Sequence, residues 1–336
     1  MKAAVVNRPF GLDNLSVMDV PDPHISDDEV KIRVAYAGIN PVDYYIISGL
    51  RNINPVPHIP GSEFGGYVEE VGSKVKNFNK GDRVIVYPRI FDGTCDLCIS
   101  GKEYLCRNGG LVGGITNGGF AEYVVVKHQN VIKIPNSLSW EKGVSLPIAG
   151  LTAFHALIES EIQPDDTVVI VGASGNTGQF AVQLAKRMGA KVIAISSKPW
   201  VKELGADEVV NMNQALNALQ RVNGGKLADV VIDSIGSKTV GRSIKLLDTG
   251  GRFVTFGALT GQTASIIISE IYSREIKIIG VTGGTRRELL RLINLANKNE
   301  VKPIIWKVFS LSDIKLAISS LFSRERNGRI LVKIAG

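Results

Sequence analysis

The cysteines of this 336-residue chain lie together in one short segment. Only three are present, and they follow the spacing C-x2-C-x7-C as Cys95, Cys98 and Cys106. Thiolates clustered in this way are common zinc ligands, and in a cytosolic protein they favour a metal site over a disulfide. The segment therefore predicts a metal-binding lobe. A metal-free loop, or a disulfide in a hyperthermophile, is the alternative.

A glycine-rich segment at residues 171–178 has the residue types of a dinucleotide-binding turn. It follows an apolar run and opens a helical pattern, with small residues at the three positions of the G-x-G-x-x-G fingerprint. Such residues allow a tight turn, a close approach of the backbone to a pyrophosphate, and packing of helix on strand. The helix start would bind the phosphate charge. The predicted contacts are Ala173, Ser174, Gly175, Asn176, Thr177 and Gly178. A plain glycine-rich turn of an α/β protein is the alternative.

The end of the next predicted strand carries no carboxylate. An NAD-specific site would place Asp or Glu here for the ribose hydroxyls, but the chain has Ser196, Ser197 and Lys198. A lysine and two hydroxyls can bind the 2′-phosphate of NADPH, which a carboxylate would repel. These residues predict a preference for NADP(H) over NAD(H). A solvated turn with an incidental lysine is the alternative.

The elements that must position these residues fall into two groups. The first 145 residues are β-rich, with short apolar or alternating runs at 30–34, 83–87 and 121–126. Beyond Pro147, helical patterns alternate with apolar strands expected at 167–171, 191–195, 228–233 and 252–256. This alternation predicts a doubly wound parallel sheet in an α/β protein. A helix from about Arg286 and a last strand at 329–333 follow.

Length and composition fit a globular protein of two domains, because single cores stop growing at about 250–300 residues. The chain is 44% hydrophobic and 21% charged, and its net charge of +7 is scattered. This composition excludes a disordered chain and gives no nucleic-acid footprint. No apolar run approaches a membrane span, and the N-terminus lacks the apolar stretch of a signal peptide. We therefore expect a cytoplasmic protein with a small-molecule substrate and neither nucleic-acid nor membrane partners.

Four segments resemble the medium-chain dehydrogenase/reductase superfamily over nearly the full length. They are GSEFGGYVEEVG at 61–72, similar to the family's GHExxGxVxxVG, together with 118–123, 151–154 and the C-terminal order from 233–236 to 282–289. The resemblance implies a GroES-like catalytic domain (1–148), a Rossmann domain (149–282), a segment returning to the first domain (283–336), and an active-site cleft between the domains. It adds to the expected cofactor contacts Thr152, Ser234, Gly257 and Thr282.

The chain departs from the zinc alcohol dehydrogenases of this family at their catalytic metal. The three aligned ligand positions hold Asn40, Ser62 and Ile148. None of these side chains is a competent zinc ligand, because zinc requires thiolate, imidazole or carboxylate. We therefore expect no catalytic zinc.

The segment Asn40-Pro41-Val42-Asp43 instead resembles the Asn-Pro-x-Asp of the zinc-independent quinone and enoyl reductases. By this resemblance Asn40 is a candidate to hydrogen-bond a substrate carbonyl or the nicotinamide environment. Asp43 is expected to act mainly as a structural hydrogen bonder. Tyr45, or its neighbour Tyr44, is a candidate donor in the cleft, with a core or interface aromatic as the alternative.

The cysteine segment also resembles a feature of the family, the structural zinc lobe C-x2-C-x2-C-x7-C. Counting back three residues from Cys95 places Asp92 at the first ligand position. A carboxylate oxygen can complete a tetrahedral zinc site. The resemblance thus implies one structural zinc held by Asp92, Cys95, Cys98 and Cys106, with Glu103 as a less well placed alternative ligand.

These features predict an NADPH-dependent oxidoreductase that transfers hydride to a quinone, or to the C=C of an enone or enoyl substrate, without catalytic zinc. An alcohol dehydrogenase or aldehyde reductase is the first alternative, and a non-catalytic NADPH-binding protein is an alternative of another class. The resemblance also implies a homo-oligomer, dimer or tetramer. The apolar segment at 265–269 could pair edge to edge across a twofold axis, or it could be an internal strand.

Overall fold

The structure, a computed structural model, describes residues 1–51 and 53–334. The chain divides into two compact units. Unit 1 comprises Met1–Ile148 together with the chain from Thr285 onward, and unit 2 comprises Ala149–Gly284. The C-terminal segment therefore belongs to the same unit as the N-terminal part of the chain.

Unit 1 is built on a seven-stranded mixed sheet in the order β16-β17-β3-β4-β5-β9, with β8 pairing to β3. The strands are β3 (Glu29–Gly38), β4 (Glu63–Val71), β5 (Arg83–Val86), β8 (Tyr123–Lys127), β9 (Val131–Lys133), β16 (Ile305–Ser310) and β17 (Arg329–Lys333). Two small antiparallel pairs join β1 (Lys2–Val6) to β2 (Leu15–Asp19), and β6 (Arg89–Ile90) to β7 (Gly110–Leu111). Alternate residues of β3 enter the core, with Val30, Ile32 and Val34 fully buried.

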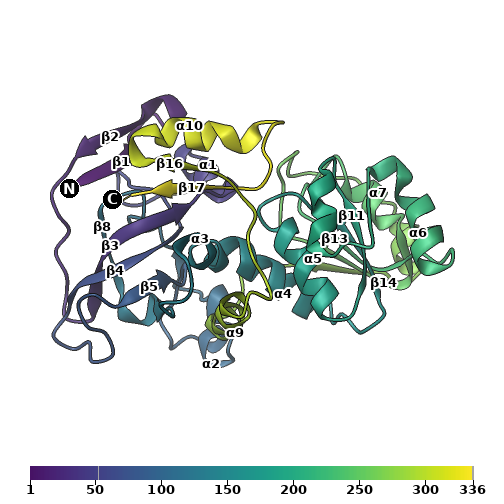
Figure 1. Cartoon of the computed structure of the whole chain (residues 1–336), viewed down its shortest axis with the longest axis horizontal. Helices are drawn as coiled ribbons and strands as arrows, with labels where there is room; N and C mark the ends of the chain where they lie inside the picture. The colour runs from purple at the N-terminus through teal and green to yellow at the C-terminus, as the bar shows by residue number, and fades with distance from the viewer. Residues whose placement is uncertain (52, 335–336) are drawn as a thin grey trace. The chain divides into compact units, whose positions relative to one another are not determined.

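The C-terminal strand β17 lies antiparallel against β3, so that segments from the N-terminal and C-terminal parts of the chain share one sheet (Figure 1). Leu331 pairs with Gly38. This register brings the start of β17 to the end of β3, where the chain turns into α1 (Pro41–Ile47). The strand expected at 329–333 is confirmed.

Unit 2 contains a six-stranded parallel sheet in the order β12-β11-β10-β13-β14-β15. Its strands are β10 (Thr167–Val171), β11 (Lys191–Ile195), β12 (Glu208–Val210), β13 (Ala228–Asp233), β14 (Leu247–Thr255) and β15 (Lys277–Gly280). Strand order reverses between β10 and β13, which is the switch point of a doubly wound sheet. The predicted combination of a GroES-like unit with a Rossmann sheet is confirmed.

The helices are α1 (Pro41–Ile47), α2 (Asp96–Ile99), α3 (Trp140–Gly143), α4 (Leu151–Glu159), α5 (Gly178–Arg187), α6 (Ala215–Asn223), α7 (Val240–Ile244), α8 (Ile268–Tyr272), α9 (Arg286–Asn297) and α10 (Ile314–Ser319). Helix α5 follows the glycine-rich turn and buries Phe180, Val182 and Leu184. No helix within residues 1–51 and 53–334 combines the length and apolarity needed to cross a membrane.

The prediction of a strand at 265–269 is wrong. Residues 265–267 form no regular element, α8 begins at Ile268, and the Ser273 N–H donates to the Ser269 carbonyl as in a helical turn. Ile267 and Ile268 are 54% and 66% exposed. A short apolar run does not by itself distinguish strand from helix. The last strand of the sheet is β15 instead.

Candidate functional site

The turn at residues 172–178 connects β10 to α5 at the carboxyl edge of the parallel sheet. Gly172 adopts a φ of 79°, which glycine tolerates without strain. A Cβ atom at Gly178 would lie 2.8 Å from Ala173 Cα and would also meet the Gly172 carbonyl, so only glycine allows α5 to begin this close to the strand. The resulting cradle at the helix start suits a pyrophosphate.

Two further predicted cofactor positions lie at the same edge of the sheet. The register aligns the ends of β10, β13 and β14, after which Ser234 and Gly257 follow. Ser234 Oγ donates to the Val171 carbonyl at 3.2 Å. A Cβ atom at Gly257 would collide with the Ser234 carbonyl. Thr282 follows β15, and Thr152 lies on α4, which packs against α5.

The end of β11 bends sharply through the predicted phosphate-selecting residues. The Ser196 N–H donates to the Val210 carbonyl at 3.0 Å, and the Lys198 N–H donates to Ser196 Oγ at 3.0 Å. The Ser196 hydroxyl therefore accepts a hydrogen bond within the bend. The local hydrogen bonds explain why a small hydroxyl residue stands at this strand end.

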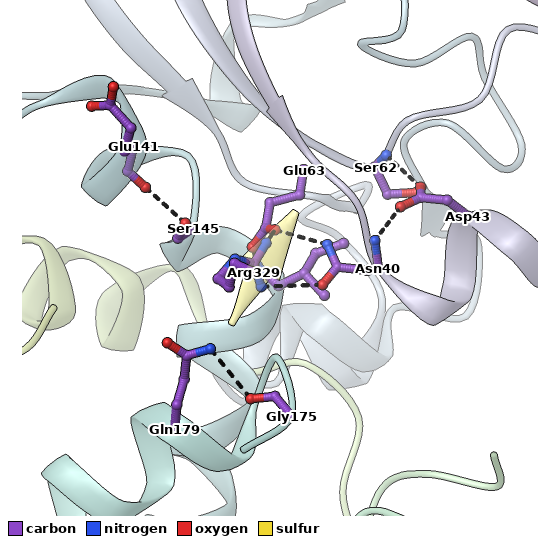
Figure 2. A network of polar contacts seen from close by, with 10 residues as sticks. Asn40, Asp43, Ser62, Glu63, Glu141, Ser145, Gly175, Gln179 and Arg329 are labelled. Carbon is purple, nitrogen blue, oxygen red and sulfur yellow. Dashed lines mark hydrogen bonds and ion pairs between the residues drawn. The ribbon is translucent and has the colours of Figure 1, made fainter. Parts of the chain in front are cut away.

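In unit 1, a buried polar network occupies the position that the resemblance assigns to a catalytic metal (Figure 2). Asn40, Glu63 and Arg329 are at most 1% exposed. Asn40 Nδ2 donates to Glu63 Oε2 at 2.7 Å, and Arg329 Nη2 forms an ion pair with the same oxygen. Arg329 Nη1 contacts Asn40 Oδ1 at 3.4 Å, and the Ile148 N–H donates to Glu63 Oε1 at 2.8 Å.

This network does not fit a zinc ion. The Asn40 side chain is engaged by Glu63 and Arg329, and Ile148 contributes a backbone N–H to Glu63. Glu63 supplies the carboxylate of the network, but the Arg329 cation already neutralises it. A divalent cation would meet a guanidinium and no thiolate or imidazole here. Asn40, the candidate to hydrogen-bond a substrate carbonyl or the nicotinamide environment, is 1% exposed, and its side chain bonds to Glu63 and Arg329.

Asp43 is a fully buried carboxylate that bonds to the chain at the start of α1 and to the chain just before β4 (Figure 2). Its Oδ2 accepts the Asn40 N–H at 2.8 Å, at the start of α1, and its Oδ1 accepts the Ser62 N–H at 3.0 Å. Burial raises the pKa of Asp43 to about 7, although these two N–H groups oppose the rise. These bonds match the structural role expected for Asp43.

Tyr45 lies on α1, two residues beyond Asp43, and is partly buried. Partial burial raises the pKa of its hydroxyl, and the nearby Arg51 opposes the rise. The hydroxyl therefore stays protonated at neutral pH and can donate a hydrogen bond. The adjacent Tyr44 instead packs edge-on against Phe322, with ring centroids 4.8 Å apart.

The cysteine lobe brings four potential metal ligands together. The ligand atoms of Asp92, Cys95, Cys98 and Cys106 all lie within 4.8 Å of one another. The sulfurs of Cys95 and Cys106 are 3.9 Å apart, close to the separation of about 3.8 Å that tetrahedral zinc–sulfur bonds of about 2.3 Å imply. All three cysteines are free thiols. The residues fit a structural zinc.

Hydrogen bonds lower the pKa of two of the lobe's potential ligands, Asp92 and Cys95, which favours their anionic forms. Asn108 Nδ2 donates to Asp92 Oδ2 at 2.6 Å and holds the pKa of that carboxyl well below its usual range. The backbone N–H of Arg107 lowers the pKa of the Cys95 thiol, whereas burial raises the pKa of Cys98 to about 12. Zinc binding would have to displace the Cys98 proton.

Glu103, the alternative ligand, lies outside this donor set. Its Oε1 accepts the Arg286 N–H at 2.6 Å, at the first residue of α9. A carboxylate at this position satisfies one of the free N–H groups of the helix start and complements the helix dipole. Glu103 therefore connects the cysteine lobe to α9 through a hydrogen bond.

Sequence reasoning singled out neither Glu63 nor Arg329 as a site residue. Each is a charged residue at the first position of a strand, β4 or β17, and is followed directly by buried residues. Such a residue must find a partner if it is buried. This signal could have marked both residues, but their pairing spans 266 positions of the sequence.

Known proteins resemble the chain along almost its whole length. Residues 26–136 match the alcohol dehydrogenase GroES-like domain, and residues 177–298 match the zinc-binding dehydrogenase family. An NAD-dependent alcohol dehydrogenase of Sulfolobus acidocaldarius is 32% identical, over 99% of this chain and 100% of that protein. An acryloyl-coenzyme A reductase of Sulfurisphaera tokodaii is 31% identical over the same shares of the two chains.

Among solved structures, a thermostable alcohol dehydrogenase from Pyrobaculum aerophilum with bound cobalt and zinc is 38% identical, with a TM-score of 0.93 over 99% of both chains. Two domain matches in the expected order, relatives aligned end to end and a shared fold agree with one another. The chain belongs to the medium-chain dehydrogenase/reductase superfamily, and is an oxidoreductase of that family.

Proposed function

We propose that this protein is an NADPH-dependent reductase that transfers hydride to the C=C of an enoyl thioester or enone, or to a quinone, without a catalytic zinc. The observation that carries the proposal is the Asn40–Glu63–Arg329 network at the metal position. Reducing an isolated carbonyl requires strong polarisation of its oxygen, which zinc supplies in related enzymes. A conjugated acceptor spreads the developing charge and needs only hydrogen bonds.

The bound cofactor would supply the hydride. The cradle before α5 would hold its pyrophosphate, with Gly178 keeping the helix start close to the strand. Ser197 and Lys198 would bind its 2′-phosphate. The Tyr45 hydroxyl would donate a hydrogen bond to the acceptor's carbonyl oxygen as charge develops there. After hydride reaches the β-carbon, a proton from water would complete the α-carbon, so that the C=C gains two electrons and two hydrogens in all.

The acryloyl-coenzyme A reductase relative supports an enoyl thioester as the acceptor. The alcohol dehydrogenase relatives favour a second candidate function, the reduction of aldehydes. Their printed names also favour NAD, whereas the absence of a carboxylate from residues 196–198 favours NADPH. We retain NADPH as the proposal because a lysine is a direct partner for a phosphate.

The test is NADPH oxidation, followed at 340 nm, against acryloyl-CoA, crotonyl-CoA, a neutral enone, a quinone and a simple aldehyde. We expect turnover of at least one conjugated acceptor and little turnover of the aldehyde. Tyr45→Phe should lower kcat by about a hundredfold to a thousandfold, the range for loss of one donor to a developing oxyanion. Tyr44→Phe is the matched control. Turnover confined to the aldehyde would overturn the proposal, and tight NADPH binding without turnover would favour a binding protein.

We also propose that the protein forms homo-oligomers through the outer edge of the unit 2 sheet. Strand β15 ends the strand order, and its Ile278 is 46% exposed. Tyr272 on the neighbouring α8 is 71% exposed. Exposed apolar side chains beside an open strand edge favour pairing with a second copy across a twofold axis. The surface differs from the expected segment at 265–269, but it lies next to it in the chain.

A further inference from the structure

Unit 1 contains a cavity of about 790 Å³ away from the Asn40–Glu63–Arg329 network, none of whose residues line it. Its walls come from the loop after β4, the segment after β6, strand β9 with the turn that precedes it, and the first turns of α9. This volume is in the range of about 300–1,000 Å³ that is typical of sites for organic ligands. We call it the basic cavity; the residues that define it here are Lys74, Lys76, Phe78, Phe91, Lys133 and Arg286.

The charge on its walls has one sign. Lys74, Lys76, Lys133 and Arg286 contribute cations, and no aspartate or glutamate lines the cavity. Lys74 and Lys133 pair at 3.2 and 2.7 Å with carboxylates that lie outside the lining, those of Asp27 and Asp82. These are exposed ion pairs, which contribute little and can be exchanged for a bound anion.

Two lining side chains keep hydrogen-bonding atoms that the protein does not use. Among the described residues, Arg286 Nε and His128 Nδ1 are buried without a hydrogen-bond partner. Arg286 is otherwise held in place, because its Nη2 donates to the Val131 carbonyl at 3.3 Å and its backbone N–H to Glu103. An unsatisfied buried donor is costly. A small shift of the guanidinium toward an acceptor in the cavity would offset that cost.

The rest of the lining combines apolar and aromatic side chains with the polar Asn77, His128 and Gln129. Lys133 Nζ lies 5.6 Å from the ring centroid of Phe78, and the ring of Phe91 packs edge-on against Tyr87 with centroids 6.1 Å apart. Val131 and Leu290 also line the cavity. A fully hydrated inorganic ion would gain nothing from these surfaces, whereas the body of an organic anion would bury apolar area against them.

We propose that the basic cavity is a second ligand site, which binds a small organic anion with a phosphate or carboxylate group and a flat apolar body. The anionic group pairs with Arg286 and the lysines, and the apolar body lies against Phe78 and Phe91. The site is independent of the proposed reduction, because none of the residues assigned to cofactor or acceptor lines it.

The experiment is titration calorimetry on full-length protein saturated with NADP⁺, so that the dinucleotide site is filled. The probes are 1-naphthyl phosphate, 1-naphthoate, neutral 1-naphthol and inorganic phosphate. We expect one of the two aromatic anions to bind at one site per chain with Kd below about 1 mM. Naphthol and inorganic phosphate should each bind about tenfold more weakly, because each lacks one half of the recognition. The stronger of the two anions identifies the charged group.

Variants locate the site. Arg286→Gln and the double variant Lys76→Gln/Lys133→Gln should each weaken binding of the anion by about tenfold or more, since each removes a charge-assisted contact. Lys226→Gln, an exposed lysine of unit 2, is the matched control and should leave the affinity unchanged. The second variant keeps the proposal testable if Arg286→Gln disturbs α9. Absence of binding by both anions at about 5 mM, or equal binding in all variants, would overturn the proposal.

Discussion

Arg329 and Glu63 form an ion pair in which both side chains are 0% exposed. They approach so closely that a Cβ atom at Gly38 would lie 2.6 Å from Arg329 Nη2 and would also meet the glutamate. The absence of a side chain at Gly38 therefore leaves the space in which Arg329 of β17 pairs with Glu63 of β4. A buried pair of this kind is costly to break from one side, because the remaining charge keeps its desolvation penalty without its partner.

We expect Arg329→Met to lower the free energy of unfolding by about 3–5 kcal/mol, because Glu63 would be left as an uncompensated buried charge. The double variant Glu63→Leu/Arg329→Met should recover much of this loss, since neither charge remains. Guanidinium chloride unfolding measures both. Arg221→Met is the control, because it breaks an exposed pair with Glu208 and should cost no more than about 1 kcal/mol. Equal losses of unfolding free energy for Arg329→Met and Arg221→Met would contradict the burial of the Arg329–Glu63 pair.

The stability contributed by Asp43 should depend on pH. Its pKa is raised to about 7 in the folded protein, against 3.8 for an ordinary aspartate, chiefly by burial. Between these values the folded state binds more protons than the unfolded state, so the free energy of unfolding falls as pH rises from about 4 to about 7 and levels off above. The difference in unfolding free energy between the natural protein and Asp43→Asn should follow this curve in urea titrations. A difference independent of pH across this window would refute the assignment.

The protein purified without chelator should contain about one zinc per chain, held in the cysteine lobe. Cys106→Ser and Asp92→Ala should lower both the zinc content and the melting temperature, because each removes a ligand from the donor set. Glu103→Gln is the matched control: it lies in the same lobe but bonds to α9, so it should retain zinc. Elemental analysis gives the stoichiometry. Two zinc ions per chain would reverse the conclusion about the metal position, and well under one would remove the structural zinc.

Lys198→Ala should raise KM for NADPH by about tenfold or more while changing KM for NADH little, because only NADPH carries the 2′-phosphate. Lys202→Ala provides a matched control on the same turn, since Lys202 Nζ donates to the Asp207 carbonyl instead. Initial rates with the two cofactors give the ratio. If the natural protein binds NADH as tightly as NADPH, the cofactor proposal fails.

Ile278→Lys should dissociate the oligomer, because it places a charge in the middle of the proposed strand edge. Val308→Lys is the matched control: Val308 is equally exposed, at 46%, and also lies on a terminal strand, β16 of unit 1. Sedimentation velocity distinguishes the outcomes. A monomeric natural protein, or dissociation by Val308→Lys alone, would show that β15 is not the interface.

The sequence by itself determined the local elements and the sites that such elements carry. The strands at 167–171, 191–195, 228–233 and 329–333 are confirmed, because a run of apolar residues between turn formers is a local property. The cysteine spacing likewise led to a donor set that converges in the structure. Each of these strands, and the cysteine lobe, lies within one short stretch of chain, so residue types and spacing suffice to define them.

Only the tertiary structure decided which buried or partly buried charges of unit 1 meet. Glu63 and Arg329 stand 266 residues apart, and Glu103 and Arg286 stand 183 apart. A buried charge indicates that a partner exists but not which one, because the choice depends on strand register and on the return of the chain. The prediction of a strand at 265–269 failed for a different reason. Its apolar residues suit either a strand or a helix, and packing decided between them: Ile266 packs against the core of unit 2, whereas Ile267 and Ile268 are exposed.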